Sequence, residues 1–150
     1  LEILEMLKER SRRVHTFAAL NTLEYLRRSG RLTRFQFGLG SMLRIKPLLT
    51  LHNSQLVMEK VRTYKRTLAR LDQLVSSLAP LEELALVHTS AIKKAEALWE
   101  RFRHLVPHIK APLLAEATPA IGVHVGPGAV GLVCVRARFT PGVKGIAGSD

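Results

Sequence analysis

The chain has little cysteine and no long hydrophobic run, and both shortages narrow its class. Its one cysteine, Cys134, cannot close an intrachain disulfide, and its place in the apolar run 130–135 predicts a buried side chain. No apolar run approaches the roughly 18 residues that a transmembrane helix needs, so we expect no stable membrane insertion. A reducing cytoplasm is the location that we expect.

Acidic and aromatic residues are also few. Against 12 Asp and Glu stand 23 Lys and Arg, which gives a net charge of +11 and indicates nucleic acid, an anionic membrane or an acidic partner. The basic residues are spread over several segments, and aromatic residues that could stack on bases make up 5% of the chain. We therefore expect no nucleic-acid partner, although a basic nucleic-acid-binding module stays an alternative.

Catalytic and metal-binding signatures are missing as well. There is no Walker loop, no GxSxG elbow and no close pair of carboxylates in an expected cleft. His104 and His108 are four residues apart, but Pro107 lies between them and the glutamate of an HExxH helix is absent. The sequence therefore predicts no metal site and no catalytic residue, which favours a binding protein over an enzyme.

With 150 residues, 47% of them apolar, the chain fits one domain with a substantial core. Periodicity predicts helices over 1–13, 21–29, 64–78 and from 91 to 106, and a further helical stretch near 35–43. The first helix is already under way at residue 1, so we expect the chain to begin inside a larger protein. Strand-like runs occupy 14–19, 46–52, 55–62, 84–89, 113–117, 121–124 and 129–137, which indicates a mixed sheet covered by helices.

Local signals predict where several of these elements begin or turn. Asn21 and Glu24 have capping-box spacing for the second helix, and Ser90 is placed to cap the helix that follows it. Asn53 and Ser54 form a two-residue hairpin turn between two strands.

Gly126, Gly128 and Gly131 spell GxGxxG, the dinucleotide-binding fingerprint. That site needs a helix after the glycines, whereas the run 130–135 is β-branched and strand-like. No acidic residue ends a second strand at the required place either. The pattern therefore does not indicate a nucleotide site.

The same loop has a second interpretation once His124 is included. If a strand ends at His124, the following Gly-Pro-Gly turn bares backbone N–H groups that can hold an anion, and the imidazole adds a donor. Alternatively, Gly126 and Gly128 only permit a tight reversal, and His124 is a hydrogen-bonded residue at a strand end. Arg62, between a strand and a helix, either lies near a ligand or meets solvent, and the residues themselves leave both questions open.

Four segments in order carry a resemblance to a known family: LEYLRRSGR at 23–31, GSMLRIKPLL at 40–49, KVRT at 60–63 and GVHVGPGA at 122–129. Over residues 1 to about 136 the chain resembles the C-terminal part of the DegV family of bacterial fatty-acid-binding proteins. Ser29 and Ser54 stand where glycine is common in the family, and Arg44 adds a charge. None of these departures touches the GxHxGPGA loop.

The resemblance implies an α/β (α+β) fold with two layers, in which helices pack on a six-stranded mixed, largely antiparallel sheet. It implies that residues 1–139 form the C-terminal domain of a longer protein. The preceding domain, absent here, would supply serine or threonine hydroxyls to the ligand. We expect residues 140–150 to be a loose tail.

The resemblance also implies the function, a non-enzymatic carrier of a long-chain fatty acid that needs no other cofactor. His124, Arg62, Gly126 and Gly128 would surround the carboxylate. The acyl chain would be lined by Phe35, Leu39, Met42, Leu43 and Ile45. A separate ATP-dependent fatty acid kinase would phosphorylate the carried acid, and the alternative in the enzyme class is a small-molecule kinase related to dihydroxyacetone kinase.

Overall fold

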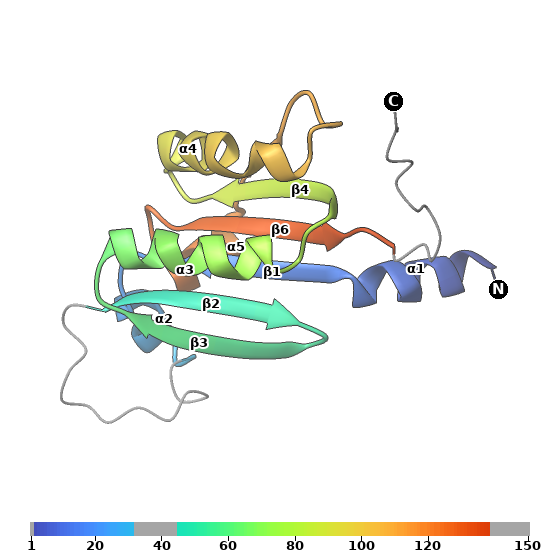
Figure 1. Ribbon diagram of the computed structural model, residues 1–150. Helices are drawn as coiled ribbons and strands as arrows, with labels where there is room; N and C mark the ends of the chain where they lie inside the picture. Colours follow the sequence, from blue (N-terminus) through green and yellow to red (C-terminus); the bar gives the residue numbers. More distant parts are fainter. Residues whose placement is uncertain (1, 32–44, 139–150) are drawn as a thin grey trace.

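The computed structural model describes residues 2–31 and 45–138, and it contains one six-stranded sheet in the order β3-β2-β1-β6-β4-β5 (Figure 1). The pair β4 and β5 is parallel, and every other neighbouring pair is antiparallel. The six strands are β1 (Val14–Ala19), β2 (Lys46–His52), β3 (Gln55–Val61), β4 (Leu81–His88), β5 (Leu113–Glu116) and β6 (Val130–Arg136). The expected six-stranded, mixed and largely antiparallel sheet is confirmed.

The helices lie on both sides of this sheet. In Figure 1, α3 and α4 cover one face, and their buried residues join the same cluster as the strands beneath them. On the opposite face, α2 and α5 contact each other near one end of the sheet. The helices are α1 (Glu2–Arg12), α2 (Glu24–Arg28), α3 (Tyr64–Ser76), α4 (Ile92–Phe102, followed by a 3-10 turn at Arg103–Leu105) and α5 (Pro119–Val125).

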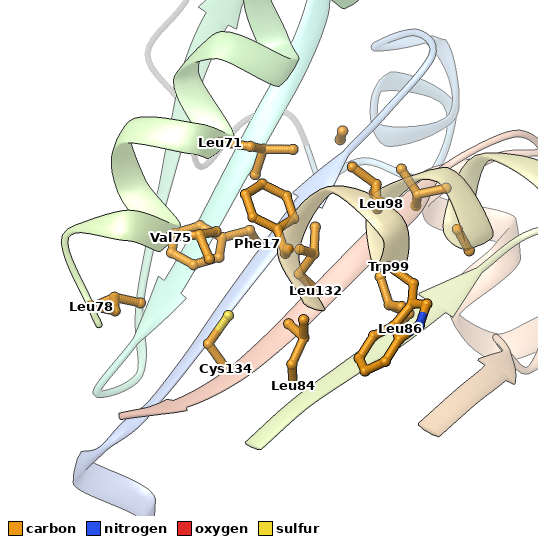
Figure 2. Packing of buried hydrophobic residues seen from close by; sticks show 14 of the residues in the cluster. Phe17, Leu71, Val75, Leu78, Leu84, Leu86, Leu98, Trp99, Leu132 and Cys134 are labelled. Carbon is orange, nitrogen blue, oxygen red and sulfur yellow. The ribbon is translucent and has the colours of Figure 1, made fainter. Parts of the chain in front are cut away.

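The main core lies between the sheet and the pair α3 and α4, and Figure 2 shows its packing. Alternate strand residues such as Phe17, Leu86 and Leu132 point into it, and helical residues such as Leu71 and Trp99 meet them. A buried side chain of this size contributes about 1.5 to 3 kcal/mol to stability.

Cys134 is fully buried in the same cluster, as the sequence predicts (Figure 2). Burial raises the pKa of its thiol to about 12, because the thiolate would lose its hydration.

The expected hairpin is confirmed, since Asn53 and Ser54 join β2 to β3 with φ of 47° and 63°. Positive φ at both central residues is the geometry of a type I′ turn, whose twist matches that of the strands.

The strand predicted at 121–124 is wrong, because these residues belong to helix α5. Pro119 occupies the first turn of α5, where its fixed φ favours a helix and its missing N–H costs nothing. Ile121 and Val123 suggested strand alternation, but both are more than half exposed. Here a proline start overrides the weak β preference of a short apolar run.

The two predicted helix caps are also wrong. The cap positions of α2 and α4 are held by Leu23 and Ala91, neither with a side-chain cap bond, and α2 is shorter than the predicted 21–29. Asn21 instead bonds to a distant loop, and Ser90 adopts a φ of 48° that a cap does not have. The helical stretch expected near 35–43 and the tail at 140–150 lie outside the described residues.

Candidate functional site

The turn Gly126-Pro127-Gly128 joins α5 to β6, and both glycines have positive φ, 75° and 78°. A Cβ at Gly126 would lie 2.2 Å from Cδ2 of Tyr25, and one at Gly128 would lie 2.1 Å from Nδ2 of Asn21. Both positions therefore need glycine because of their conformation and because residues 21–25 pack directly on the turn.

The backbone N–H groups of this turn are already used inside the protein. Gly126 N–H donates to the Gly122 carbonyl at 2.8 Å, and Gly128 N–H donates to the Thr89 carbonyl at 2.7 Å. Ala129 N–H donates to the Thr89 hydroxyl at 3.0 Å, and Pro127 has no N–H. The expectation that this turn bares N–H donors for an anion is wrong, so donors to a ligand must come from side chains. That Gly126 and Gly128 shape a binding site stays a prediction.

A network of side chains also holds the carbonyl groups of the turn. The Thr89 hydroxyl donates to the Gly126 carbonyl at 2.6 Å, and Asn21 Nδ2 donates to the Pro127 carbonyl at 3.2 Å. Lys94 Nζ donates to the Gly128 carbonyl and to Asn21 Oδ1, both at 3.1 Å. The Lys46 ammonium donates to the Asn21 carbonyl at 2.8 Å. Every carbonyl of the turn thus has a donor, which makes the turn a fixed platform.

His124 lies in the last turn of α5 and is partly buried. Its Nδ1 atom is shielded from solvent, and it has no hydrogen-bond partner among the residues that the structure describes. Buried polar atoms are paired in the great majority of cases, so an unpaired one points to an external partner. The alternative of a hydrogen-bonded histidine at a strand end is wrong, because His124 lies in helix α5 with Nδ1 unpaired. The other half of that alternative is confirmed, since positive φ at Gly126 and Gly128 permits the tight reversal.

Arg62 is exposed and lies between β3 and Thr63, which caps α3 by accepting a hydrogen bond from Arg66 N–H at 3.2 Å. Val61 pairs with Lys46 across the hairpin, and Lys46 reaches Asn21 beside the turn. Arg62 thus leaves the sheet at the same end as the turn, although β2 and β1 lie between β3 and β6. Its predicted role near the carboxylate stays a prediction.

An apolar hollow of about 270 Å³ lies next to α5, on the face of the sheet opposite α3 and α4. The strands contribute Thr16, Ala18, Val87 and Gly131 to its wall. Helix α5 contributes Ile121 and Val125, the latter adjacent to His124 in the chain. The helix that carries the unpaired imidazole therefore forms part of the wall of the hollow.

The apolar surface continues along the same face of the sheet. A second hollow of about 420 Å³ is lined by Ala85, Leu113 and Val135 among others, and it shares Val133 with the first. Leu113, in the edge strand β5, is 70% exposed, so part of this apolar surface meets solvent. The sequence signal for this surface is that β4 and β6 carry apolar residues on both faces, which is typical of strands covered on both sides.

Of the residues predicted to line an acyl chain, Phe35, Leu39, Met42 and Leu43 lie outside the described residues. Ile45 is described and half-buried, and it packs against the small cluster around Leu23 and Leu26. Ala18 and Val125 pack against this same cluster, and both line the apolar hollow. Ile45 and two wall residues of the hollow therefore pack against the same cluster.

Two features are absent from the described residues, 2–31 and 45–138. No group of three or more His, Cys, Asp or Glu side chains in them could hold a metal ion. Likewise, none of the helices in that part of the chain is long and apolar enough to cross a membrane.

A family model described as an uncharacterised protein of the DegV family matches residues 1–137. A DegV domain-containing protein of Streptomyces coelicolor is 35% identical over 136 residues, which covers 88% of this chain and 48% of the relative. The chain spans about half the length of the curated relatives that it matches.

Solved structures of DegV proteins are also similar to this chain. A fatty-acid-binding DegV family protein from Streptococcus agalactiae is 29% identical with a TM-score of 0.71, covering 91% of this chain and 50% of that one. DegV from Bacillus subtilis, described as a fatty-acid-binding protein, is 31% identical with a TM-score of 0.69, covering 89% and 49%.

Proposed function

Because this chain belongs to the DegV family, we propose that it binds a long-chain fatty acid, with the carboxylate at His124 and the acyl chain along the apolar hollow beside α5. Relatives from Streptococcus agalactiae and Bacillus subtilis are described as fatty-acid-binding proteins. The observation that carries the proposal is the unpaired, solvent-shielded Nδ1 atom of His124, in a helix whose Ile121 and Val125 line an apolar hollow. A fatty acid has the matching shape, since it joins one acceptor group to a long apolar tail.

The head group would take its hydrogen bond from the imidazole. Neutral histidine offers one N–H donor and charged histidine offers two, and an ionised carboxylate accepts only. The N–H groups of the glycine turn are used internally, so the turn would act by shape. Gly126 and Gly128 would form the wall beside the carboxylate, and Arg62 would lie near its exposed side.

The acyl chain would lie on the sheet face that α3 and α4 do not cover. Burial of each CH₂ group is worth about 0.8 kcal/mol, so the tail supplies most of the affinity. An open face does not enclose a chain alone, as the exposure of Leu113 indicates. We propose that residues 1–139 are the C-terminal domain of a protein about twice as long, and that the preceding domain closes the site and adds hydroxyl donors.

The proposed role is that of a carrier and not of an enzyme. A separate ATP-dependent kinase would phosphorylate the bound carboxylate to an acyl phosphate, while this protein presents the substrate in the cytoplasm. The carrier role is favoured because the chain's candidate site consists of one imidazole, a glycine turn and an apolar wall.

Lipid extraction tests the proposal. The whole gene product is purified and extracted with organic solvent, and the extract is examined by mass spectrometry beside that of an unrelated protein purified in the same way. We expect a long-chain fatty acid in near-stoichiometric amount. Absence of such an acid, together with no uptake on incubation with palmitic or oleic acid, would falsify the proposal.

A further inference from the structure

Helix α5, which carries His124, is weakly held by its own residues. It has seven residues, no side-chain bond at its N-cap and no buried residue. Helices this short are unstable alone, because the cost of nucleation is not recovered over so few hydrogen bonds. The position of the His124 imidazole must therefore be set by contacts made elsewhere in the protein.

Thr89, the residue that follows β4, makes the densest set of such contacts. Its N–H donates to the Ala129 carbonyl at 3.0 Å, and its carbonyl accepts from Gly128 N–H at 2.7 Å. Its hydroxyl donates to the Gly126 carbonyl at 2.6 Å and accepts from Ala129 N–H at 3.0 Å. All the polar groups of this buried residue are thus directed at the turn after α5.

The bond to Gly126 is the one that bears on His124. Gly126 is the C-cap of α5, and its N–H closes the last helical bond to Gly122. The Thr89 hydroxyl is therefore hydrogen-bonded to the backbone carbonyl two residues after His124. The N-cap of α5 has no side-chain hydrogen bond, and the chain just before it is held by the Ala117 N–H, which donates to the His88 carbonyl at 2.7 Å. The bond from Thr89 is a side-chain hydrogen bond that holds the C-terminal end of the helix.

We propose that Thr89 is a positioning residue of the head-group site: its hydroxyl fixes the C-terminal end of α5 and so directs the His124 imidazole at the bound carboxylate. The proposal rests on the function proposed above. It separates the two parts of ligand recognition, because most of the apolar wall comes from strand residues such as Thr16, Ala18 and Val87, whose positions do not depend on the hydroxyl. Loss of the hydroxyl should weaken recognition of the carboxylate and largely preserve binding of the acyl chain.

Competition between two ligands of equal chain length tests this separation. Palmitic acid and 1-hexadecanol each displace a fluorescent fatty acid from the whole gene product, and the ratio of their affinities measures carboxylate recognition. We expect the wild-type protein to prefer the acid by about tenfold or more, the value of a charge-assisted hydrogen bond. Thr89→Val should reduce that preference to within about threefold, and Thr89→Ser, which keeps the hydroxyl, should retain it.

Thr67 provides the matched control. It is another buried threonine, and its hydroxyl donates to the Thr63 carbonyl at 3.1 Å within α3. Thr67→Val should lower the melting temperature without changing the ratio of the two affinities. If Thr89→Val does not fold, Thr89→Ala replaces it, because the space left admits water to pair the two backbone groups.

Two failures can be told apart. A wild-type protein that binds neither the probe nor palmitic acid contradicts the proposed function. A wild-type protein that prefers the acid, with a folded Thr89→Val variant that prefers it equally, overturns the role of Thr89 and leaves the function standing.

Discussion

The side chains of Asn21 and Lys94 meet beside the glycine turn, with 3.1 Å between Lys94 Nζ and Asn21 Oδ1. Asn21 follows β1 and Lys94 lies in α4, so this contact joins segments from the two faces of the sheet. Lys94 also donates to the Gly128 carbonyl and lies 5.5 Å from the centre of the Tyr64 ring. The Lys94 ammonium group therefore contacts the turn, the loop after β1 and the start of α3.

Lys94→Met should destabilise the protein by about 1 to 2 kcal/mol. Methionine keeps the apolar stem, but it leaves the Gly128 carbonyl and the Asn21 amide oxygen without the hydrogen bond that the ammonium group donates. Urea denaturation followed by circular dichroism measures the change. Lys93→Met is the control, since Lys93 is the exposed neighbour in the same helix and should change stability by under about 0.5 kcal/mol. Equal effects of both substitutions would contradict a structural role for the Lys94 ammonium group.

Gly126→Ala should cost at least about 2 kcal/mol, since the new methyl group meets the Tyr25 ring and alanine resists a positive φ. Gly122→Ala, four residues earlier in the same helix, should be neutral or stabilising by up to about 1 kcal/mol. The position of Gly122 has open space around its Cβ and no positive φ. Thermal unfolding of the two variants distinguishes them, and a similar loss in both would refute the packing of Tyr25 on the turn.

His124→Ala should weaken phosphorylation by a partner kinase more than it weakens binding of the lipid. A tail of about fifteen carbons supplies on the order of 10 kcal/mol before ordering costs, whereas one charge-assisted hydrogen bond supplies about 1.5 to 3 kcal/mol. The imidazole would thus mainly orient the head group. Lipid affinity and the rate of acyl phosphate formation are measured side by side, with exposed His104→Ala as control. Equal losses in the two measurements would speak against an orienting role.

Cys134 should make stability fall in alkaline solution. Burial raises the pKa of its thiol from 9.0 to about 12, so the folded state keeps the proton that the unfolded state releases. The resulting stabilisation is complete below pH 9 and is lost as the pH rises from about 9 to about 12. Urea denaturation at pH 7, 9 and 10 measures this slope, which should be shallower in Cys134→Ala.

The same burial makes the thiol unreactive in the folded protein. Iodoacetamide at pH 8 should label Cys134 only after denaturation, as judged by mass spectrometry. Rapid labelling of the native protein would show that the core around β6 opens.

Much of the fold was predictable from local pattern. The sequence pattern predicted five of the six strands to within one residue at both ends, and the positive-φ hairpin at Asn53 and Ser54 followed from turn chemistry. Prediction failed where two local signals competed, as at Pro119, or where a polar residue suited to a cap had a distant partner, as at Asn21.

The candidate site was predictable only in part. The sequence pointed to His124 and the glycine turn. Of the residues that it predicted to line an acyl chain, Ile45 alone lies among the described residues, and the apolar hollow itself was not predicted. The hollow is assembled from β1, β4, β6 and α5, and no single segment carries its pattern. The same holds for Thr89, which no sequence pattern indicated, because its four hydrogen bonds reach residues about forty positions away.

By itself, the sequence determined the sheet, the buried cysteine, the amphipathic helices and the family to which the chain belongs. These depend on periodicity and on short motifs, which act over a few residues. Only the tertiary structure decided that residues 119–125 form a helix, that the N–H groups of the turn are used internally and that His124 Nδ1 lacks a partner. The helix depends on a competition between two local signals, and the N–H groups of Gly128 and Ala129 bond to Thr89, about forty residues away in the chain, a pairing that no local pattern contains.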